Sequence, residues 1–131
     1  VDTERGLVVP VIREADRKGV AQIARERRDL AERARSGKLR PDELSGGTFT
    51  LTNLGAFEID AFTPIVNPPE GAVLGVGRIV KKPVVRDDEL RPGMTVVLSL
   101  TFDHRLIDGG PAARFLQRIK TLVEKPHLLI A

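Results

Sequence analysis

His104 is the residue whose setting best suits proton transfer, and it is one of only two histidines in the 131 residues. It lies in the segment TFDHRLIDGG, after residues that favour a strand and before a segment with helical periodicity. At such a position a rigid element directs the side chain while the loop leaves room for a substrate. Imidazole changes its charge near neutral pH, and His104 is therefore a candidate catalytic residue. His127, beside Pro126, has no comparable setting.

Asp108 follows His104 by four residues, across a glycine-rich turn. A carboxylate at this spacing can orient the loop, pair with an arginine such as Arg105, or raise the basicity of the imidazole, and the spacing does not choose among the three. An H-x-x-x-D pattern alone is more typical of a hydrogen-bonded histidine at the end of a strand. The flanking glycines and the charged triplet at 103–105 favour a functional site, because buried charges need partners.

Helices that would position these residues are indicated by apolar periodicity. Apolar residues recur at helical spacing from Gly19 to Arg35, and Ser36-Gly37 ends that segment. A second amphipathic helix is expected after Gly109-Gly110, with Pro111 as its first residue, and it ends before Pro126.

Strands are expected between the two helices. The segments rich in apolar, β-branched and aromatic residues are Thr48–Thr52, Ala72–Val76, Ile79–Val85 and Met94–Phe102, with a hairpin turn between the last two at 87–89 and Pro92-Gly93. Leu7–Ile12 is an edge strand or an extended entry segment, because its Pro10 has no N–H to donate. A hairpin with few parallel crossovers favours an α/β layer arrangement with a mixed sheet.

Composition narrows the classes of protein to consider. The chain has no cysteine, which excludes disulfides, zinc–thiolate sites, iron–sulfur clusters and a cysteine nucleophile within it. A hydrophobic content of 41% with 30% charged residues is typical of a folded chain, and the length suits one domain, residues 1–131. Without a signal-peptide pattern or an apolar run of about 18 residues, we expect a soluble intracellular protein with no membrane partner.

The net charge of +3 is concentrated in residues 13–40, which hold ten basic and five acidic residues. Surfaces that bind nucleic acid combine such charge with aromatic residues for stacking or with a known binding fold, and this segment has no aromatic residue. We interpret it as a solvated helix face, with an anionic partner as the alternative, and expect no nucleic acid.

Four segments in the same order resemble the dihydrolipoamide acyltransferases, the E2 cores of 2-oxoacid dehydrogenase complexes. The resemblance covers nearly the whole chain. The shorter pattern H-R-x-x-D-G is shared with other chloramphenicol-acetyltransferase-like enzymes, so the four segments together carry the match. They are RGLVVPVIREAD at Arg5–Asp16, GKLRPDELSGGTFTLTNLG at Gly37–Gly55, FTPIVNPPEGAVLGVG at Phe62–Gly77 and LTFDHRLIDGG at Leu100–Gly110.

The resemblance implies roles for three residues. His104 would be the general base that takes the proton from the thiol of coenzyme A or of dihydrolipoamide. Thr52, where many family members have serine, would donate its hydroxyl to the tetrahedral oxyanion, and Asp108 would hold the active-site loop through an ion pair. Coenzyme A and dihydrolipoamide are then substrates, with the lipoyl group on a separate domain, and no metal is expected. No coenzyme A contact can be assigned to a named residue.

The resemblance also implies a chloramphenicol-acetyltransferase-like two-layer α/β fold with a mixed β-sheet and amphipathic helices. Residues 1–131 would be the C-terminal part of the catalytic domain, truncated at its N-terminus. Family members form homotrimers that assemble into a larger core with active sites between neighbouring subunits. Their other partners are the lipoyl domain and, through domains that these residues do not include, the E1 and E3 components.

The sequence leaves more than one interpretation for the acyl group that is transferred, for the location of the protein and for whether the chain itself is catalytic. We expect acetyl transfer in a bacterial cytoplasm, with a branched-chain acyl group and the mitochondrial matrix as the respective alternatives. A non-catalytic structural core fragment that supports oligomer assembly is the main competing interpretation. A condensation domain fits less well, because Asp103 stands where that family usually has a second histidine. A serine hydrolase would need a G-x-S-x-G elbow, which the sequence lacks.

Overall fold

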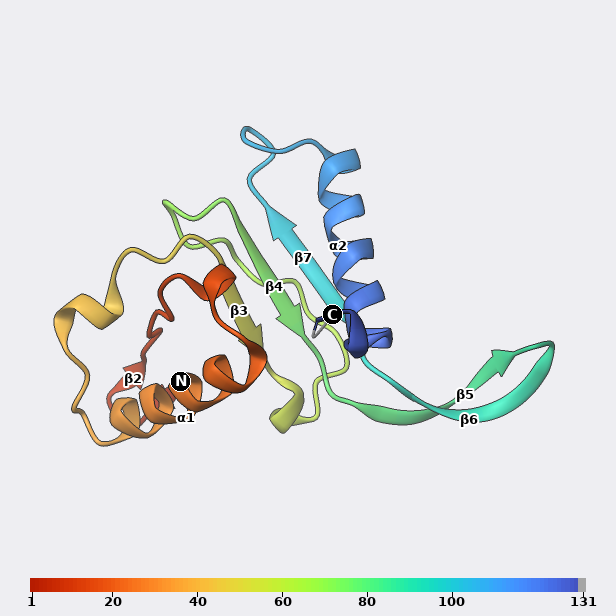
Figure 1. Cartoon of the computed structure of the whole chain (residues 1–131), viewed down its shortest axis with the longest axis horizontal. Helices are drawn as coiled ribbons and strands as arrows, with labels where there is room; N and C mark the ends of the chain where they lie inside the picture. Colours follow the sequence, from red (N-terminus) through yellow and green to blue (C-terminus); the bar gives the residue numbers. More distant parts are fainter. Residues whose placement is uncertain (130–131) are drawn as a thin grey trace. The chain divides into compact units, whose positions relative to one another are not determined.

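The computed structural model describes residues 1–129, which divide into two compact units. One unit holds residues 1–47 together with the C-terminal residues from Leu122, and the other holds Thr48–Thr121 (Figure 1). The residues proposed above for chemistry, Thr52, His104 and Asp108, all belong to the second unit.

The first unit is built on one long helix. Its elements are β1 (Asp2–Thr3), β2 (Gly6–Leu7), η1 (Ala15–Arg17), α1 (Val20–Arg35), η2 (Pro41–Leu44) and η4 (Pro126–Leu129). The predicted helix is confirmed, and its end has a clear cause. Gly37 has a positive φ of 69°, its N–H donates to Ala34 O, and the N–H of Lys38 donates to Arg33 O. These two bonds satisfy the last carbonyls of α1, and glycine adopts the required conformation without strain.

Leu7–Ile12 has little strand structure. The antiparallel pair β1–β2 joins Asp2 to Leu7 and Thr3 to Gly6, so only Leu7 of the predicted segment lies in a strand. Of the two alternatives, an edge strand or an extended entry segment, the second describes residues 8–12.

A mixed three-stranded sheet forms the centre of the second unit, in the order β3–β4–β7. Its strands are β3 (Thr50–Asn53), β4 (Ala72–Val76) and β7 (Leu98–Phe102). β4 pairs parallel with β3 and antiparallel with β7, as the prediction of a mixed sheet requires. Ala72, Val73 and Leu74 of the middle strand are buried. The core of this unit therefore lies on β4.

The hairpin differs from its prediction. β5 (Val80–Arg86) and β6 (Glu89–Thr95) pair along their whole lengths, so Pro92-Gly93 lies inside a strand and not in a turn. Met94–Phe102 is accordingly divided between β6 and β7. The turn itself is Asp87-Asp88, both with positive φ, a pattern that matches the right-handed twist of a hairpin. The hairpin extends as an arm beyond β4 and β7 in Figure 1.

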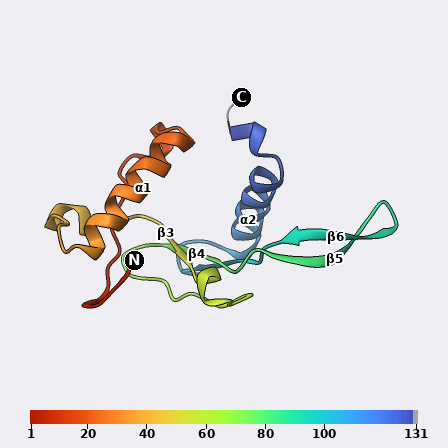
Figure 2. The same cartoon turned by 90° about the horizontal axis from the view of Figure 1, so that it is seen from below.

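α2 (Gly109–Glu124) begins two residues before the predicted Pro111 and lies on one face of the sheet (Figure 2). Ala112 is buried, and the ring of Phe115 packs edge-on against Phe49, with centroids 5.8 Å apart. A sheet covered by an amphipathic helix is the two-layer arrangement expected from the sequence. A short 3-10 turn, η3 (Gly55–Phe57), follows β3.

Candidate functional site

His104 lies on the loop between the end of β7 and the start of α2. Its side chain is 72% exposed, and its ring stacks at a tilt on that of Phe102, the last residue of β7, with centroids 5.7 Å apart. β7 is held in the sheet by Phe102 pairing with Ala72 of β4. The predicted position of His104, exposed at the end of a rigid strand, is confirmed.

Asp108 lies beside His104 but does not form a hydrogen bond of normal length with it. The shortest distance, from Asp108 Oδ1 to His104 Nδ1, is 3.8 Å. Its backbone carbonyl accepts the N–H of Ala112 at 3.2 Å, which anchors the first turn of α2. Asp108 therefore connects the loop to the helix through its backbone, and its carboxylate faces the imidazole from a distance that a small side-chain movement would close.

The ion pair on this loop belongs to Asp103 and Arg105. Arg105 donates from Nη2 to Asp103 Oδ2 at 2.7 Å and from its backbone N–H to Asp103 Oδ1 at 2.9 Å. Hydrogen bonds from the Arg105 side chain and then from its backbone lower the pKa of the Asp103 carboxyl to about 2. From the sequence, Arg105 was one possible partner of Asp108, and its pair with Asp103 was not predicted.

Thr52 lies far from His104 within one chain. It pairs with Gly75 of β4, and Gly75 pairs with Ser99 of β7. His104 follows Phe102, which pairs with Ala72, so the two side chains belong to opposite ends of β4, separated by roughly 10 Å along that strand alone. The structure thus brings Asp108 to His104 and leaves Thr52 apart from both.

A cavity of about 840 Å³ opens beside the His104 loop, within the second unit. It lies between residues 63–70 and the end of β7, and both Asp103 and Arg105 line it. The N–H of Glu70 donates to Asn67 O and closes a turn at Asn67, Pro68 and Pro69. The Glu70 side chain accepts a hydrogen bond from Thr50 Oγ1 at 2.6 Å. The volume lies within the range of small-molecule pockets.

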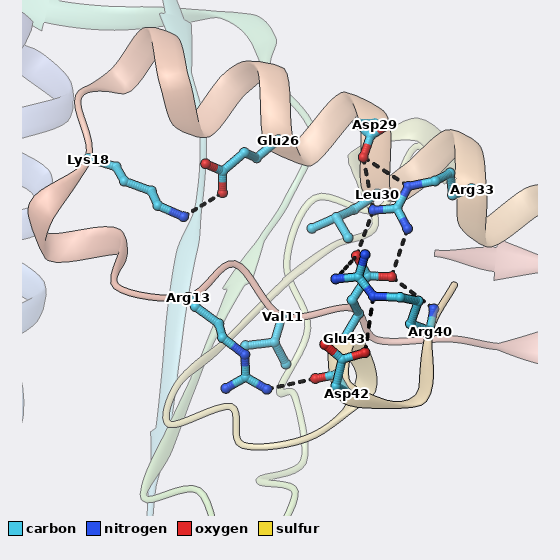
Figure 3. Close-up of a pocket in the computed structure, with 10 residues that line it drawn as sticks. All are labelled: Val11, Arg13, Lys18, Glu26, Asp29, Leu30, Arg33, Arg40, Asp42 and Glu43. Atoms are coloured by element: carbon cyan, nitrogen blue, oxygen red, sulfur yellow. Dashed lines mark hydrogen bonds and ion pairs between the residues drawn. The ribbon is translucent and has the colours of Figure 1, made fainter. Parts of the chain in front are cut away.

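A second pocket, of about 280 Å³, lies in the first unit, and its charges are paired with one another (Figure 3). Arg33 donates to both carboxylate oxygens of Glu43 at 2.7 Å, Lys18 donates to Glu26 at 2.6 Å, and Arg13 donates to Asp42 O at 2.6 Å. Hydrogen bonds from Arg33, and then from the backbone of Arg40, lower the pKa of Glu43 to about 2. The Arg33–Glu43 contact fastens η2 to α1, and we interpret this pocket as structural.

Within residues 1–129 the structure holds no group of three or more histidine, cysteine, aspartate or glutamate side chains placed to bind a metal ion. Nor does a helix among those residues have the length and apolar character needed to cross a membrane.

A mixed sheet with a helix on one face and an exposed histidine at a strand end defines an α/β protein with a candidate acid–base site. The sequence model of the family "2-oxoacid dehydrogenases acyltransferase (catalytic domain)" matches residues 1–131, and the chain belongs to this family.

Relatives and solved structures agree with that assignment. The chain is 48% identical over 129 residues to the dihydrolipoyllysine-residue acetyltransferase component of the Staphylococcus aureus pyruvate dehydrogenase complex, and 49% identical to its Bacillus subtilis counterpart. These matches cover 98% of this chain but 30% and 29% of the relatives. The chain thus spans less than a third of the length of these curated relatives.

Among solved structures, the chain resembles one studied for the role of a serine, a histidine and an asparagine in the catalytic mechanism of Azotobacter vinelandii dihydrolipoamide acetyltransferase. The TM-score is 0.94 at 45% identity, covering all of this chain and 54% of the other. The cubic core of a pyruvate dehydrogenase multienzyme complex matches with the same values. A truncated catalytic core of the Thermoplasma acidophilum 2-oxoacid dehydrogenase multienzyme complex matches with a TM-score of 0.83 at 47% identity, covering 96% of this chain and 55% of that one.

Proposed function

We propose that the protein is an acyltransferase that moves an acyl group between dihydrolipoamide and coenzyme A, with His104 as the general base. The observation that carries the proposal is the exposed imidazole at the end of β7, in a chain that belongs to an acyltransferase family. An exposed side chain on a rigid strand end is open to a substrate thiol and is directed by the sheet.

Direct thioester exchange needs little from the protein beyond a base and a stabilised oxyanion. A thiol titrates about two pH units above an imidazole, so neutral His104 can take the thiol proton at small cost as the sulfur attacks the thioester carbonyl. The carbonyl oxygen becomes an oxyanion, the carbon–sulfur bond to the leaving thiol breaks, and the proton passes from His104 to that thiolate. No acyl-enzyme forms on this route.

Thr52 is the proposed hydroxyl donor to the oxyanion. In the Azotobacter vinelandii enzyme, the serine under study precedes the histidine by 52 positions and the asparagine follows it by four. Thr52, His104 and Asp108 have the same spacings here, with threonine for serine and aspartate for asparagine. Threonine keeps the hydroxyl, while its extra methyl group restricts the rotamer.

The active site is proposed to lie between two copies of the chain. The sheet register places Thr52 and His104 at opposite ends of β4, too far apart to act on one carbonyl. A neighbouring copy would have to supply the second residue. A trimer provides three equivalent sites of this kind, and the likeness to a cubic core supports assembly of such trimers into a larger particle.

Asp108 is proposed as a supporting residue. Its carboxylate, 3.8 Å from His104 Nδ1, is placed to orient the imidazole once the loop tightens around a substrate. The Azotobacter vinelandii enzyme has an asparagine at the matching spacing, and that side chain also carries an oxygen that can accept a hydrogen bond.

The preferred donor is acetyl-coenzyme A, because the Staphylococcus and Bacillus relatives are named as acetyltransferase components of pyruvate dehydrogenase complexes. A branched-chain acyl group is the second candidate. The acceptor dihydrolipoamide would be carried by a separate lipoyl domain, with E1 and E3 components joining through other domains. A bacterial cytoplasm is the proposed location.

The test is transfer of acetyl from acetyl-coenzyme A to dihydrolipoamide by the full-length assembled protein. We expect activity that His104→Ala lowers by about 10²–10⁴, the range that a general base typically contributes to the rate. His127→Ala is the matched control and should keep full activity. Succinyl and branched acyl donors test specificity in the same assay.

The alternative is a non-catalytic core protein that supports oligomer assembly. The separation of Thr52 from His104 within one chain is the observation that favours it. A full-length protein that assembles but transfers no acyl group from any of the three donors would establish this alternative.

A further inference from the structure

The two charged residues that flank His104 in sequence bind each other around it. We propose that Asp103 and Arg105 form a clip that fixes the backbone of His104 and so positions its imidazole for proton transfer. This inference rests on the proposed function, in which His104 is the base. In the clip, Asp103 and Arg105 are positioning residues that do not themselves react.

The clip consists of hydrogen bonds from three donor groups of Arg105 to the carboxylate of Asp103. Asp103 Oδ1 accepts the backbone N–H of Arg105 at 2.9 Å and its Nε at 3.0 Å, and Asp103 Oδ2 accepts Nη2 at 2.7 Å. The backbone bond alone makes a local turn, and the two-pronged side-chain contact adds a charged bond in a fixed orientation. His104 is the single residue enclosed by this ring of bonds.

One side of the clip is anchored to the body of the second unit. The N–H of Asp103 donates to Gly71 O at 2.8 Å, directly before β4, and its carbonyl accepts the N–H groups of Leu106 and Ile107 at 2.9 and 3.1 Å. The Asp103 side chain is 21% exposed, whereas that of Arg105 is 89% exposed. Asp103 is therefore the residue of the clip that is anchored to the body of the second unit, and the exposed Arg105 side chain binds to it.

His104 needs such support because its own ring is weakly held. The ring is 72% exposed, and Asp108 approaches it only to 3.8 Å. The direction of the side chain is then set by the backbone turn from which it projects and by the ring of Phe102. A displacement of about 1 Å in a reacting group can cost about a hundredfold in rate, so loss of the turn should appear in the catalytic step.

Four variants of the full-length assembled protein separate the parts of the clip. Asp103→Asn keeps an oxygen for the backbone bond but loses the ion pair, and Arg105→Gln loses the ion pair from the other side. We expect each to lower kcat about tenfold at unchanged KM, because the turn is only partly loosened. Asp103→Ala removes both bonds and should lower kcat about a hundredfold. Arg105→Lys keeps a charge and should recover most of the activity lost in Arg105→Gln.

The chain offers a matched control in the hairpin. Glu89 and Arg91 form an ion pair with the same spacing around one residue, on the exposed arm away from His104. Glu89→Gln should leave kcat unchanged. Because Arg105 is so exposed, Arg105→Gln should assemble and melt like the wild type, which keeps the test valid even if Asp103→Ala fails to fold.

Three outcomes would overturn the clip. Wild-type kcat in Asp103→Asn and Arg105→Gln, with His104→Ala inactive, would refute it and leave the proposed function standing. A rise in KM at constant kcat would make Arg105 a substrate contact and not a positioning residue. A wild-type protein without acyl transfer would refute the proposed function, and the clip with it.

Discussion

The Thr52 hydroxyl is half-buried on β3, the edge strand of the sheet. Strand side chains alternate between faces, so Thr52 and Thr50 lie on one face while Leu51, 65% exposed, lies on the other. Thr50 already donates its hydroxyl to Glu70 at 2.6 Å. Thr52, which is not used in that contact, remains available to a substrate carbonyl.

Thr52→Val replaces the hydroxyl by a methyl group of similar size and shape. We expect acetyl transfer to fall by about 10²–10³ because one oxyanion donor is lost, while assembly and thermal stability stay near those of the wild type. Steady-state kinetics of the full-length protein measure the effect. Thr52→Ser keeps the hydroxyl and should stay within about threefold of wild type. Equal activity in the valine and serine variants would remove Thr52 from the mechanism.

The sequence suggested residues for the candidate site, and their roles stay predictions; it did not show how these residues are held. His104 and Asp108 were predicted from a pattern of residue types, and Asp108 lies beside His104 in the structure as the spacing suggested. The Asp103–Arg105 pair depends on the turn geometry after β7, which residue types at i and i+2 do not specify. The separation of Thr52 from His104 depends on strand register, which no local pattern contains.

Among the elements, those with a clear local signal were predicted well. Ala72–Val76 was predicted as a strand with the bounds that β4 has, and α1 differs from its prediction by one residue. The predicted turn of the hairpin included the observed Asp87-Asp88 but extended too far, because Pro92-Gly93 normally ends a strand. In a two-stranded ribbon each strand has a free edge, and a proline there need not interrupt a hydrogen-bond ladder. Pro83 faces Pro92 across β5 and β6 in this way.

The contact between η2 and α1 was missed altogether, because Arg33 and Glu43 lie ten residues apart on different elements. Arg33 donates to both carboxylate oxygens, and the Glu43 side chain is only 11% exposed. Glu43 also accepts the backbone N–H of Arg40 at 2.8 Å, which caps η2. One carboxylate thus fastens the segment that leads into β3.

Glu43 makes the stability of this contact depend on pH. Its pKa falls from 4.5 to about 2 on folding, so the contact stabilises the folded state fully above about pH 4.5 and loses that effect as pH falls through about 2. We expect Glu43→Gln to lower the thermal unfolding midpoint at neutral pH, and the difference from wild type to shrink across that range. Circular dichroism melts at a series of pH values measure it.

Glu32→Gln is the control for that series, since Glu32 is exposed on α1, the helix that carries Arg33. Its melting difference from wild type should be small and the same at every pH. A Glu43→Gln deficit that persists unchanged near pH 2 would show that lost packing, and not the ion pair, is responsible.

Many large apolar side chains of the chain are exposed to solvent. Val73 is the one large side chain among the described residues that is almost fully buried, while Ile65 is 90% exposed and Leu90 73% exposed. Apolar side chains exposed to this degree are typical of surfaces covered in an assembly. The chain also spans 54% of the Azotobacter vinelandii structure that it resembles. That residues 1–131 are part of a larger catalytic domain stays a prediction.

The central claim is that each active site takes Thr52 from one copy and His104 from another. Complementation between His104→Ala and Thr52→Val proteins tests it most directly. The two full-length variants are unfolded together, reassembled in equal amounts, and assayed for acetyl transfer beside each variant reassembled alone.

If the site lies between copies, random mixing restores both residues in about a quarter of the sites, and activity rises to about a quarter of wild type. If both residues act from the same chain, no mixed site is complete, and the mixture stays at the average of the two variants. That second result, obtained from particles that contain both variants, would contradict the account.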